Sequence, residues 1–194
     1  VFIWMFKYCV SNLLLASPHM NKVSQDLWKY AVITVGDSEQ GTENMGFLLN
    51  QGVLNIDHKQ ITTIYGLDHT LPRATVHCGG PLNTDRCTVL HSPEYRTNTT
   101  RSFNAHSSIT FDNRIIQDIV QGRGPRQWKI MLGHCEWRDG QLDAEIIREG
   151  GWQEALWCHT AWGNYKRKDK MWRRIIEQNS VIHANSFLDS VFTQ

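Results

Sequence analysis

Residues 133–145 read GHCEWRDGQLDAE, and this stretch carries the strongest structural signals in the chain. It follows an apolar run at 128–133, which is typical of a strand, and Asp139-Gly140 is a common turn pair. Leucine and isoleucine then recur at helical spacing over 141–149. The sequence therefore predicts a strand, a tight turn and a helix in immediate succession.

The predicted turn also gathers residues that favour ligand binding. Gln141 is the first residue after Gly140, and we expect its backbone N–H to be without a partner and to attract an anion or another acceptor. Trp137 lies on the other side of the turn, where it would wall a cleft. The alternative is a tryptophan that only packs over the turn.

Similar patterns occur along the rest of the chain. Short apolar runs bounded by Gly, Pro, Asn or Asp are typical of strands, and apolar residues three or four apart are typical of helices. The two kinds of element intermingle without regular β-α-β alternation, which favours a single mixed α+β domain over residues 1–194. We expect its core over about residues 12–178, with an N-terminal extension and a C-terminal tail. The further predicted strands are 12–17, 30–35, 45–50, 74–78, 87–91 and 102–110, and the further predicted helices are 57–65, 112–120 and 168–178.

Composition narrows the function classes. The 194 residues carry 20 basic and 19 acidic side chains, a net charge of +1 that is unlike the basic excess of a dedicated nucleic-acid binder. The five cysteines are odd in number and form no CxxC pair, so we expect no disulfide framework and a reducing cytoplasm. The apolar start of the chain is interrupted by Lys7 and is shorter than the run of about 20 residues that crosses a bilayer, so we expect no membrane span.

Histidine and cysteine raise the question of metal binding or catalysis. Cys87 and His91 would lie about 13 Å apart in a strand, too far to hold one ion, so we expect no metal site. Cys135 and Cys158 are the candidate nucleophiles of a Cys/His-dependent hydrolase, and this enzyme class or a metal-dependent hydrolase remains an alternative function. His134 would point to the opposite face of a strand from Cys135, so it could not activate that thiol directly.

The most basic stretch is 165–174, YKRKDKMWRR. Its cations are interleaved with aromatic residues, a pattern that could contact phosphates, so nucleic-acid binding is a second, less favoured alternative function. The other interpretation is the solvent-exposed face of an amphipathic helix whose apolar residues pack inward. The candidate nucleic-acid residues are Lys166, Arg167, Lys168, Lys170, Arg173 and Arg174.

Four blocks of the sequence resemble the YqgE/AlgH family. One block is the opening stretch 133–145. The other three are LLLASPHM at 13–20, MGFLLN at 45–50, and GGPLNTDR with VLHS over 79–92, and all four follow the family's order. The sequence departs from the hallmark at residues 134–136, where His, Cys and Glu replace aromatic or smaller residues. Within the opening stretch, the matches to the family's strand–turn–helix hallmark are Gly133, Trp137, Gly140, Gln141, Leu142 and Glu145.

The resemblance implies a single α+β domain built on a strongly curved, partly barrel-like mixed sheet flanked by helices. It implies a cytoplasmic protein without a cofactor or an established enzymatic activity, and the family's name reflects a regulatory role proposed in alginate production. We therefore expect a non-enzymatic binding or regulatory protein whose partner is a small anion, a peptide or another protein.

The predicted binding cleft is made of polar and aromatic residues at strand ends and turns. Arg86 would hold a carboxylate or phosphate through its fork of donors, and Trp137 would offer a stacking face. Asp85 and Glu145 would orient Arg86 or bind a donor, unless Asp85, Arg86 and Gln141 only tie loops together. The full candidate cleft is Asn50, Gly79, Gly80, Pro81, Asp85, Arg86, His91, Trp137, Gln141 and Glu145.

Overall fold

A computed structural model describes residues 13–18, 27–37, 44–52, 76–148, 150–165 and 167–192. Within these ranges nine strands form one sheet, in which β4 pairs parallel with β8 and the other pairs are antiparallel. The helix predicted over 57–65 and the N-terminal extension lie outside the described residues.

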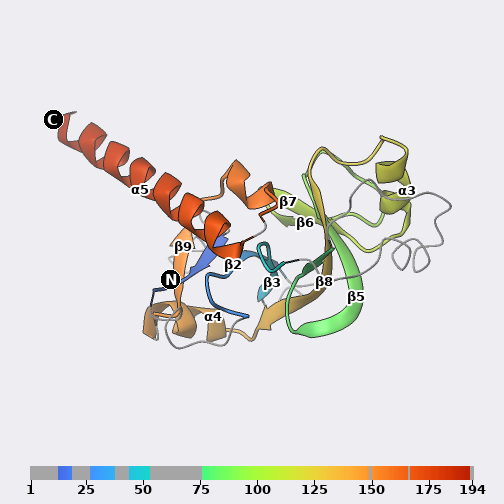
Figure 1. The fold of residues 1–194 in the computed structure, drawn as a ribbon, viewed down its shortest axis with the longest axis horizontal. Helices are drawn as coiled ribbons and strands as arrows, with labels where there is room; N and C mark the ends of the chain where they lie inside the picture. The colour runs from blue at the N-terminus through green and yellow to red at the C-terminus, as the bar shows by residue number, and fades with distance from the viewer. Residues whose placement is uncertain are drawn as a thin grey trace, which may run out of the picture.

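The strand order is β6-β7-β5-β8-β3-β2-β1-β9, with β4 beside β8. The strands are β1 (Leu13–Ala16), β2 (Val32–Asp37), β3 (Asn44–Leu48), β4 (Val76–Cys78), β5 (Leu82–His91), β6 (Arg101–Asn104), β7 (Ser107–Thr110), β8 (Trp128–Trp137) and β9 (Trp152–Ala155). The helical elements are α3 (Arg114–Val120), α4 (Gln141–Asp143), the π-helical η1 (Ala144–Arg148), the 3-10 helix η2 (His159–Trp162) and α5 (Lys168–Phe192). Figure 1 shows α3 and α5 toward opposite ends of the molecule.

The sheet curls until strands far apart in its order meet. Asn104, at the end of β6, donates from Nδ2 to the Thr34 hydroxyl (2.9 Å) and to the Val35 carbonyl (3.0 Å) in β2. Gly36 permits this approach, because a Cβ at that position would overlap the backbone carbonyl of Phe103. The result is a half-barrel, which confirms the α+β class and the strongly curved, partly barrel-like sheet.

The largest apolar cluster joins both halves of the curled sheet to α5. Phe47 of β3 packs against Phe103 of β6, with ring centroids 5.3 Å apart. Met171 and Ile175 of α5 are fully buried in the same cluster. The predicted inward face of the helix after residue 168 is therefore confirmed at these two positions.

A second apolar cluster lies on the opposite face of β1. Leu13 and Leu15 belong to the first cluster and Leu14 belongs to the second, because successive strand residues point to opposite faces. This second cluster includes Trp137, Trp152 and Leu142 of α4, and it forms the floor beneath the turn that follows β8.

The third apolar cluster lies under α3, toward the other end of the molecule (Figure 1). The helix buries Ile115, Ile116 and Ile119 against Val89 and Ile130. These isoleucines are the stripe that the sequence predicted over 112–120.

Several boundaries differ from those predicted. The segment 102–110 is a hairpin of β6 and β7, because residues 105–106 form a turn in which the His106 N–H donates to Asn104 Oδ1 (2.9 Å). β5 begins at Leu82 rather than at Cys87, since its first half is exposed and has no apolar pattern. β9 and η2 had no sequence prediction.

The last helix is longer than expected. α5 runs to Phe192, beyond the predicted end of the core at 178, and Figure 1 shows its C-terminal part projecting from the sheet. In the part of the chain that the structure describes, no helix combines the length and apolar character needed to span a bilayer.

Candidate functional site

The stretch 133–145 forms one side of a cleft with a volume of about 420 Å³. Three tryptophans from separate segments meet here edge to face: the ring centroids of Trp28 and Trp152 are 5.9 Å apart, and those of Trp137 and Trp152 are 6.5 Å apart. We name this site the tryptophan cleft. Its described lining residues are Trp28, Pro81, Leu82, Cys135, Glu136, Trp137, Gln141, Glu145, Gly151 and Trp152.

Glu145 holds two of these tryptophans in place. Its Oε2 accepts hydrogen bonds from the indole N–H groups of Trp137 (3.0 Å) and Trp152 (2.9 Å), and its Oε1 accepts one from the side-chain amide of Gln141 (2.9 Å). The two tryptophans are only 4% and 5% exposed, so their donors need a partner inside the protein. Glu145 therefore positions the walls of the cleft.

The turn after β8 uses its own donors. Gly140 adopts a left-handed conformation with φ of 73°, which glycine reaches without steric cost. The Gln141 N–H donates to the Arg138 carbonyl (2.9 Å), and the Gln141 side-chain oxygen accepts the Arg138 N–H (3.2 Å). The prediction of an unpartnered Gln141 N–H is therefore wrong. Trp137 does line the cleft, but its burial leaves little of the ring as a stacking face.

Two glycines bring the end of β4 against β8. A Cβ on Gly79 would overlap the Gly133 carbonyl, and a Cβ on Gly80 would overlap the His134 carbonyl. The Gly79 N–H donates to the Leu132 carbonyl at 2.7 Å, so its polar group is used within the sheet. Their role is close packing, and Pro81 is the member of the predicted Gly79–Pro81 turn that lines the cleft.

The structure divides the rest of the predicted cleft. Arg86 lies farther along β5 and lines a different cavity of about 490 Å³, with its guanidinium 4.4 Å from the centre of the Phe111 ring. Asp85 is exposed on the same half of β5 and lines neither cavity. The prediction that both join Trp137 is wrong, because the pairing of β5 with β8 shifts between Leu82 and Cys87 and separates these residues from the turn.

His91 is a buried structural residue rather than a cleft residue. It is fully buried, its Nδ1–H donates to the Ser92 carbonyl (2.9 Å), and its Nε2 contacts the Thr110 hydroxyl (3.0 Å). Burial lowers the pKa of the His91 imidazole and favours its neutral form. Its predicted place in the cleft is therefore wrong, since both ring nitrogens are engaged inside the sheet.

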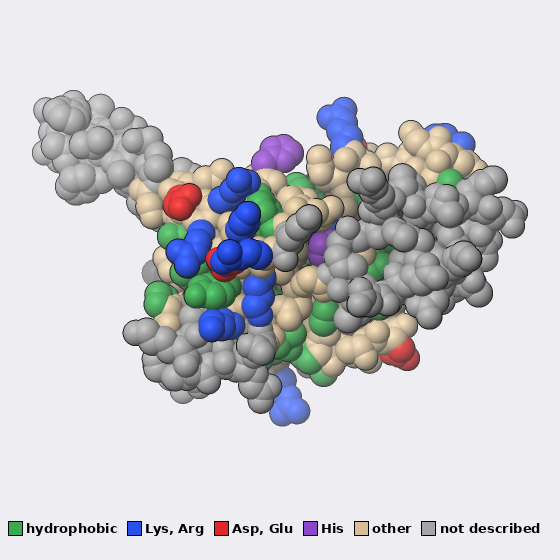
Figure 2. All heavy atoms as spheres, in the orientation of Figure 1, with side chains coloured by type: hydrophobic (Ala, Val, Ile, Leu, Met, Phe, Trp, Pro, Cys, Tyr) green, Lys and Arg blue, Asp and Glu red, His purple; other side chains and the backbone are tan. Residues whose placement is uncertain are grey.

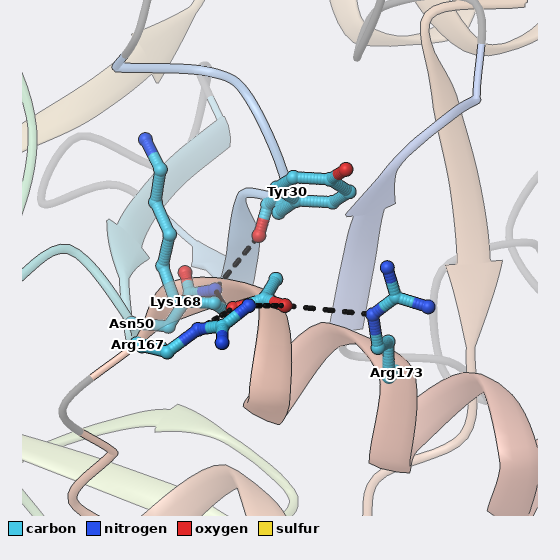
Figure 3. A network of polar contacts seen from close by, with 6 residues as sticks. Tyr30, Asn50, Arg167, Lys168 and Arg173 are labelled. Atoms are coloured by element: carbon cyan, nitrogen blue, oxygen red, sulfur yellow. Dashed lines mark hydrogen bonds and ion pairs between the residues drawn. The ribbon is translucent and has the colours of Figure 1, made fainter.

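Asn50 is likewise a tie between backbone segments (Figure 3). Its Oδ1 accepts the Val32 N–H (2.9 Å), and its Nδ2 donates to the carbonyls of Tyr30 (2.7 Å) and Lys168 (2.8 Å). These bonds join β2 to the start of α5, and Asn50 does not line the tryptophan cleft. The cleft prediction is wrong for Asn50 too, because backbone groups use its whole amide.

Cys135 and Cys158 are poorly suited to nucleophilic attack. The Cys135 Sγ donates to the Gly79 carbonyl at 3.7 Å, and burial, followed by the charges of Cys78 and Glu145, raises the pKa of its thiol to about 12. Burial also raises the pKa of the Cys158 thiol. Both thiolates are thus disfavoured near neutral pH. Among the described residues, no three His, Cys, Asp or Glu side chains are grouped to hold a metal ion.

The basic run lies on one face at the start of α5 and contains an internal acid. Figure 2 shows Lys and Arg side chains gathered there with an acidic side chain among them. Asp169 accepts two hydrogen bonds from Arg167 (3.0 and 2.8 Å) and lies 3.5 Å from Arg173 Nε (Figure 3). The Arg174 guanidinium lies 5.3 Å from the centre of the Tyr165 ring. Lys166 lies outside the described residues.

Sequence reasoning missed several residues of the tryptophan cleft. Trp28 and Trp152 lie outside the stretch 133–145, and the signal for them was the high count of eight tryptophans. Leu82 is a large hydrophobic side chain that is 42% exposed. It therefore gives the cleft an apolar surface open to solvent.

Two buried polar residues were also missed. Lys129 is 1% exposed and donates from Nζ to the Gly163 carbonyl (3.0 Å) and the Asn164 side-chain oxygen (3.1 Å), and burial lowers its pKa to about 8. His77 is 5% exposed, and burial together with the nearby Lys129 charge lowers its pKa to about 3. The sequence signal for a buried charge was the position of Lys129 inside the apolar run at 128–133.

Comparisons with known proteins agree with this fold. A family model described as AlgH-like matches residues 13–183. A UPF0301 protein of Gluconobacter oxydans is 29% identical to this chain, over 73% of this chain and 75% of that protein. A UPF0301 protein of Methylococcus capsulatus is also 29% identical, over 86% of this chain and 88% of that protein.

Two solved structures share the architecture. The solution structure of the AlgH protein from Pseudomonas aeruginosa superposes with a TM-score of 0.64 at 21% identity, covering 83% of this chain and 84% of that one. The crystal structure of protein DIP2367 from Corynebacterium diphtheriae gives a TM-score of 0.65 at 15% identity, covering 87% and 86%. At these identities the likeness concerns the fold.

Proposed function

The chain belongs to the AlgH-like family, as its sequence blocks predicted, and we propose that it is a non-enzymatic cytoplasmic binding protein that acts through the tryptophan cleft. The partner that the cleft fits is a peptide or protein segment with a large apolar side chain beside a basic one. The observation that carries this proposal is the meeting of an exposed apolar wall and an exposed carboxylate in one concave site.

The apolar wall provides the binding energy. Leu82 is exposed at the start of β5, next to Pro81, and the partly buried Trp28 lines the same space. Covering these side chains would remove apolar surface from water, and tryptophan is enriched among residues that dominate binding interfaces. An apolar side chain of the partner is therefore expected to enter the cleft.

The charge of the cleft selects the neighbouring side chain. Both charged residues among its described lining, Glu136 and Glu145, are acidic. Glu145 already accepts three hydrogen bonds, whereas the Glu136 side chain is 40% exposed and bonds to His134 at 2.7 Å. Glu136 is therefore the carboxylate that can receive a lysine or arginine of the partner.

The thiol chemistry supports a binding protein of the cytoplasm. The Cys135 thiol lines the cleft, but the raised pKa keeps it protonated and unreactive. The described cysteines are thiols rather than disulfides, the form that a reducing compartment maintains. A regulatory role follows if the bound segment belongs to a protein whose activity the contact changes.

A selection experiment tests this proposal. A phage-displayed random peptide library would be selected on the whole protein, and the enriched peptides would be synthesised and measured by calorimetry. We expect peptides in which a leucine or aromatic residue adjoins Lys or Arg. Leu82→Asp should weaken their binding by about tenfold or more, and Glu136→Gln by several-fold.

Thr84→Asp is the matched control, because it adds the same charge to the exposed half of β5 at a residue that does not line the cleft. This variant should bind the selected peptides as the wild type does. Peptides without the apolar–basic pair, or equal binding to Leu82→Asp, would count against the proposal.

Nucleic-acid binding through the basic run is the second candidate function. Lys170, Arg173 and Arg174 near the start of α5 are exposed, and this favours nucleic-acid binding. Figure 2 shows Lys and Arg side chains gathered on the face in view. Asp169 opposes this function by occupying Arg167 and Arg173. A gel shift at two salt concentrations separates the candidates, since phosphate contacts weaken steeply with salt and the apolar cleft should not respond in that way.

A further inference from the structure

We propose that the outer edge of β9 extends the peptide site, and that an extended segment of the partner adds to the sheet there as a further strand. This inference rests on the proposed function, because it assigns the backbone contacts of the same peptide. β9 comprises Trp152–Ala155, and Gly151 and Trp152 at its start line the tryptophan cleft. The edge therefore continues directly from the cleft.

β9 ends the strand order of the sheet. It pairs with β1, and in the part of the chain that the structure describes no strand pairs with its other side. A strand in this position presents a row of backbone N–H and C=O groups that a further strand can use. The hydrogen bonds around β1 determine which residues of β9 direct these groups outward.

The backbone groups of Trp152 and Glu154 point away from β1. Ser17, which follows the last residue of β1 and lies opposite Gly151, donates its N–H to the Gly151 carbonyl at 2.9 Å. In an antiparallel pair, residues that bond across the ladder alternate with residues that do not. Every second residue from Gly151 onward therefore bonds toward β1, and Trp152 and Glu154 direct their N–H and C=O groups to the outer side.

Leu156 agrees with this alternation. It lies two residues beyond Glu154, so its N–H should also point to the outer side, and it donates there to the Asn179 side-chain oxygen of α5 at 2.8 Å. Figure 1 shows α5 passing close to β9. A side chain of another element thus already accepts a hydrogen bond from this edge at its C-terminal end, which leaves the part nearer the cleft for a partner.

The side chains of β9 indicate which segment fits. Trp152 packs in the second apolar cluster, and Glu154, two residues later, lies on the same face and is exposed. A strand added beside β9 would lie about 5 Å away and would place every second side chain on this face. One such side chain enters the cleft beside Trp152, and the next on that face meets the Glu154 carboxylate. The partner therefore carries a basic residue two positions from its apolar one.

The charge of the edge favours a partner protein over a second copy of this chain. Pairing between two β9 strands would bring the exposed Glu154 carboxylates of both copies close together, and like charges across a ladder are destabilising. A segment with a basic side chain at that position has the opposite charge.

The test uses a selected apolar–basic peptide whose backbone amides are N-methylated one at a time. N-methylation removes one N–H donor and leaves every side chain in place. A strand added to β9 directs alternate amides toward the sheet, so we expect about tenfold weaker binding by calorimetry at every second position of the paired stretch, and less than about twofold at the positions between. Equal losses at consecutive positions, or no loss at any position, would overturn strand addition.

Amide hydrogen exchange of the whole protein supplies the matched control. Saturation with the unmodified peptide should slow exchange of the Glu154 N–H by about tenfold or more and leave that of the neighbouring Gln153, which points toward β1, nearly unchanged. Peptide binding without slower exchange at Glu154 would overturn the inference and leave the cleft function standing, whereas a protein that binds no selected peptide would overturn both. A dimer in sedimentation that the peptide dissociates would assign the edge to a second copy and overturn the inference as well.

Discussion

The tryptophan cleft and the cavity lined by Arg86 place their charged side chains in different surroundings. In the cleft, the half-buried Glu145 accepts three hydrogen bonds from neighbouring side chains through its two oxygens. In the cavity, Arg86 and Arg101 are exposed. The carboxylate connects parts of the fold, whereas the two arginines lie at the surface.

The difference shows that residue type alone does not identify a ligand group. The half-buried Glu145 carboxylate is the acceptor for two buried indole N–H groups, so it contributes to stability. An exposed arginine has little effect on folding. Substitution of Glu145 should therefore change stability more than substitution of Arg86 does.

The largest expected effect is on stability at the cleft. Glu145→Ala leaves two buried indole donors without a partner, and we expect the free energy of unfolding to fall by about 4 kcal/mol, at about 2 kcal/mol for each donor. Urea unfolding followed by circular dichroism measures it. Glu145→Gln keeps an acceptor oxygen and should lose less than half as much. A loss below about 1 kcal/mol for Glu145→Ala would show that the cleft does not depend on this carboxylate.

The next expected effect is on the pH dependence of stability, and it arises from the buried His77. The unfolded chain protonates His77 below about pH 6.5, but the folded protein holds its pKa at about 3, so stability is lost as the pH falls through this window. We expect His77 to account for about 3 kcal/mol of the loss between pH 6.5 and 4. The variant His77→Asn should show a correspondingly flatter pH dependence of its unfolding free energy.

The exposed His159 offers a control for this experiment. His159→Asn should reproduce the wild-type pH dependence. If His77→Asn instead loses stability with acid as steeply as the wild type does, His77 is accessible to protons in the folded state and its burial has no energetic consequence.

The smallest expected effect is on stability at Arg86. Arg86→Ala removes an exposed cation–π contact with Phe111, so the free energy of unfolding should change by less than about 1 kcal/mol. The same urea titration measures it beside Glu145→Ala. A loss as large as that of Glu145→Ala would abolish the distinction between the half-buried Glu145 and the exposed Arg86.

The sequence predicted the local features better than the spatial ones. The order of strand, turn and helix through 133–145 is confirmed, because Gly140 and the apolar spacing act within a few residues. The isoleucine stripe of α3 is confirmed for the same reason. Both depend on backbone preferences that neighbouring residues determine.

The composition of the site depends on long-range pairing, which the sequence pattern does not show. Trp152 reaches Trp137 because β9 pairs with β1 at the far edge of the sheet, and β9 had no clear sequence signal. Arg86 departs from Trp137 because of the shift between β5 and β8. Pro81 and Glu145 could be placed together from the family blocks, whereas Leu82 had no reason to be singled out.

The central claim is that the tryptophan cleft is the binding site, and an NMR titration tests it most directly. The wild-type protein would be titrated with a selected apolar–basic peptide. We predict that the peptide shifts the indole signals of Trp28, Trp137 and Trp152 and leaves the Arg86 Nε–H unchanged. Peptide binding that leaves all three indoles unmoved would contradict it.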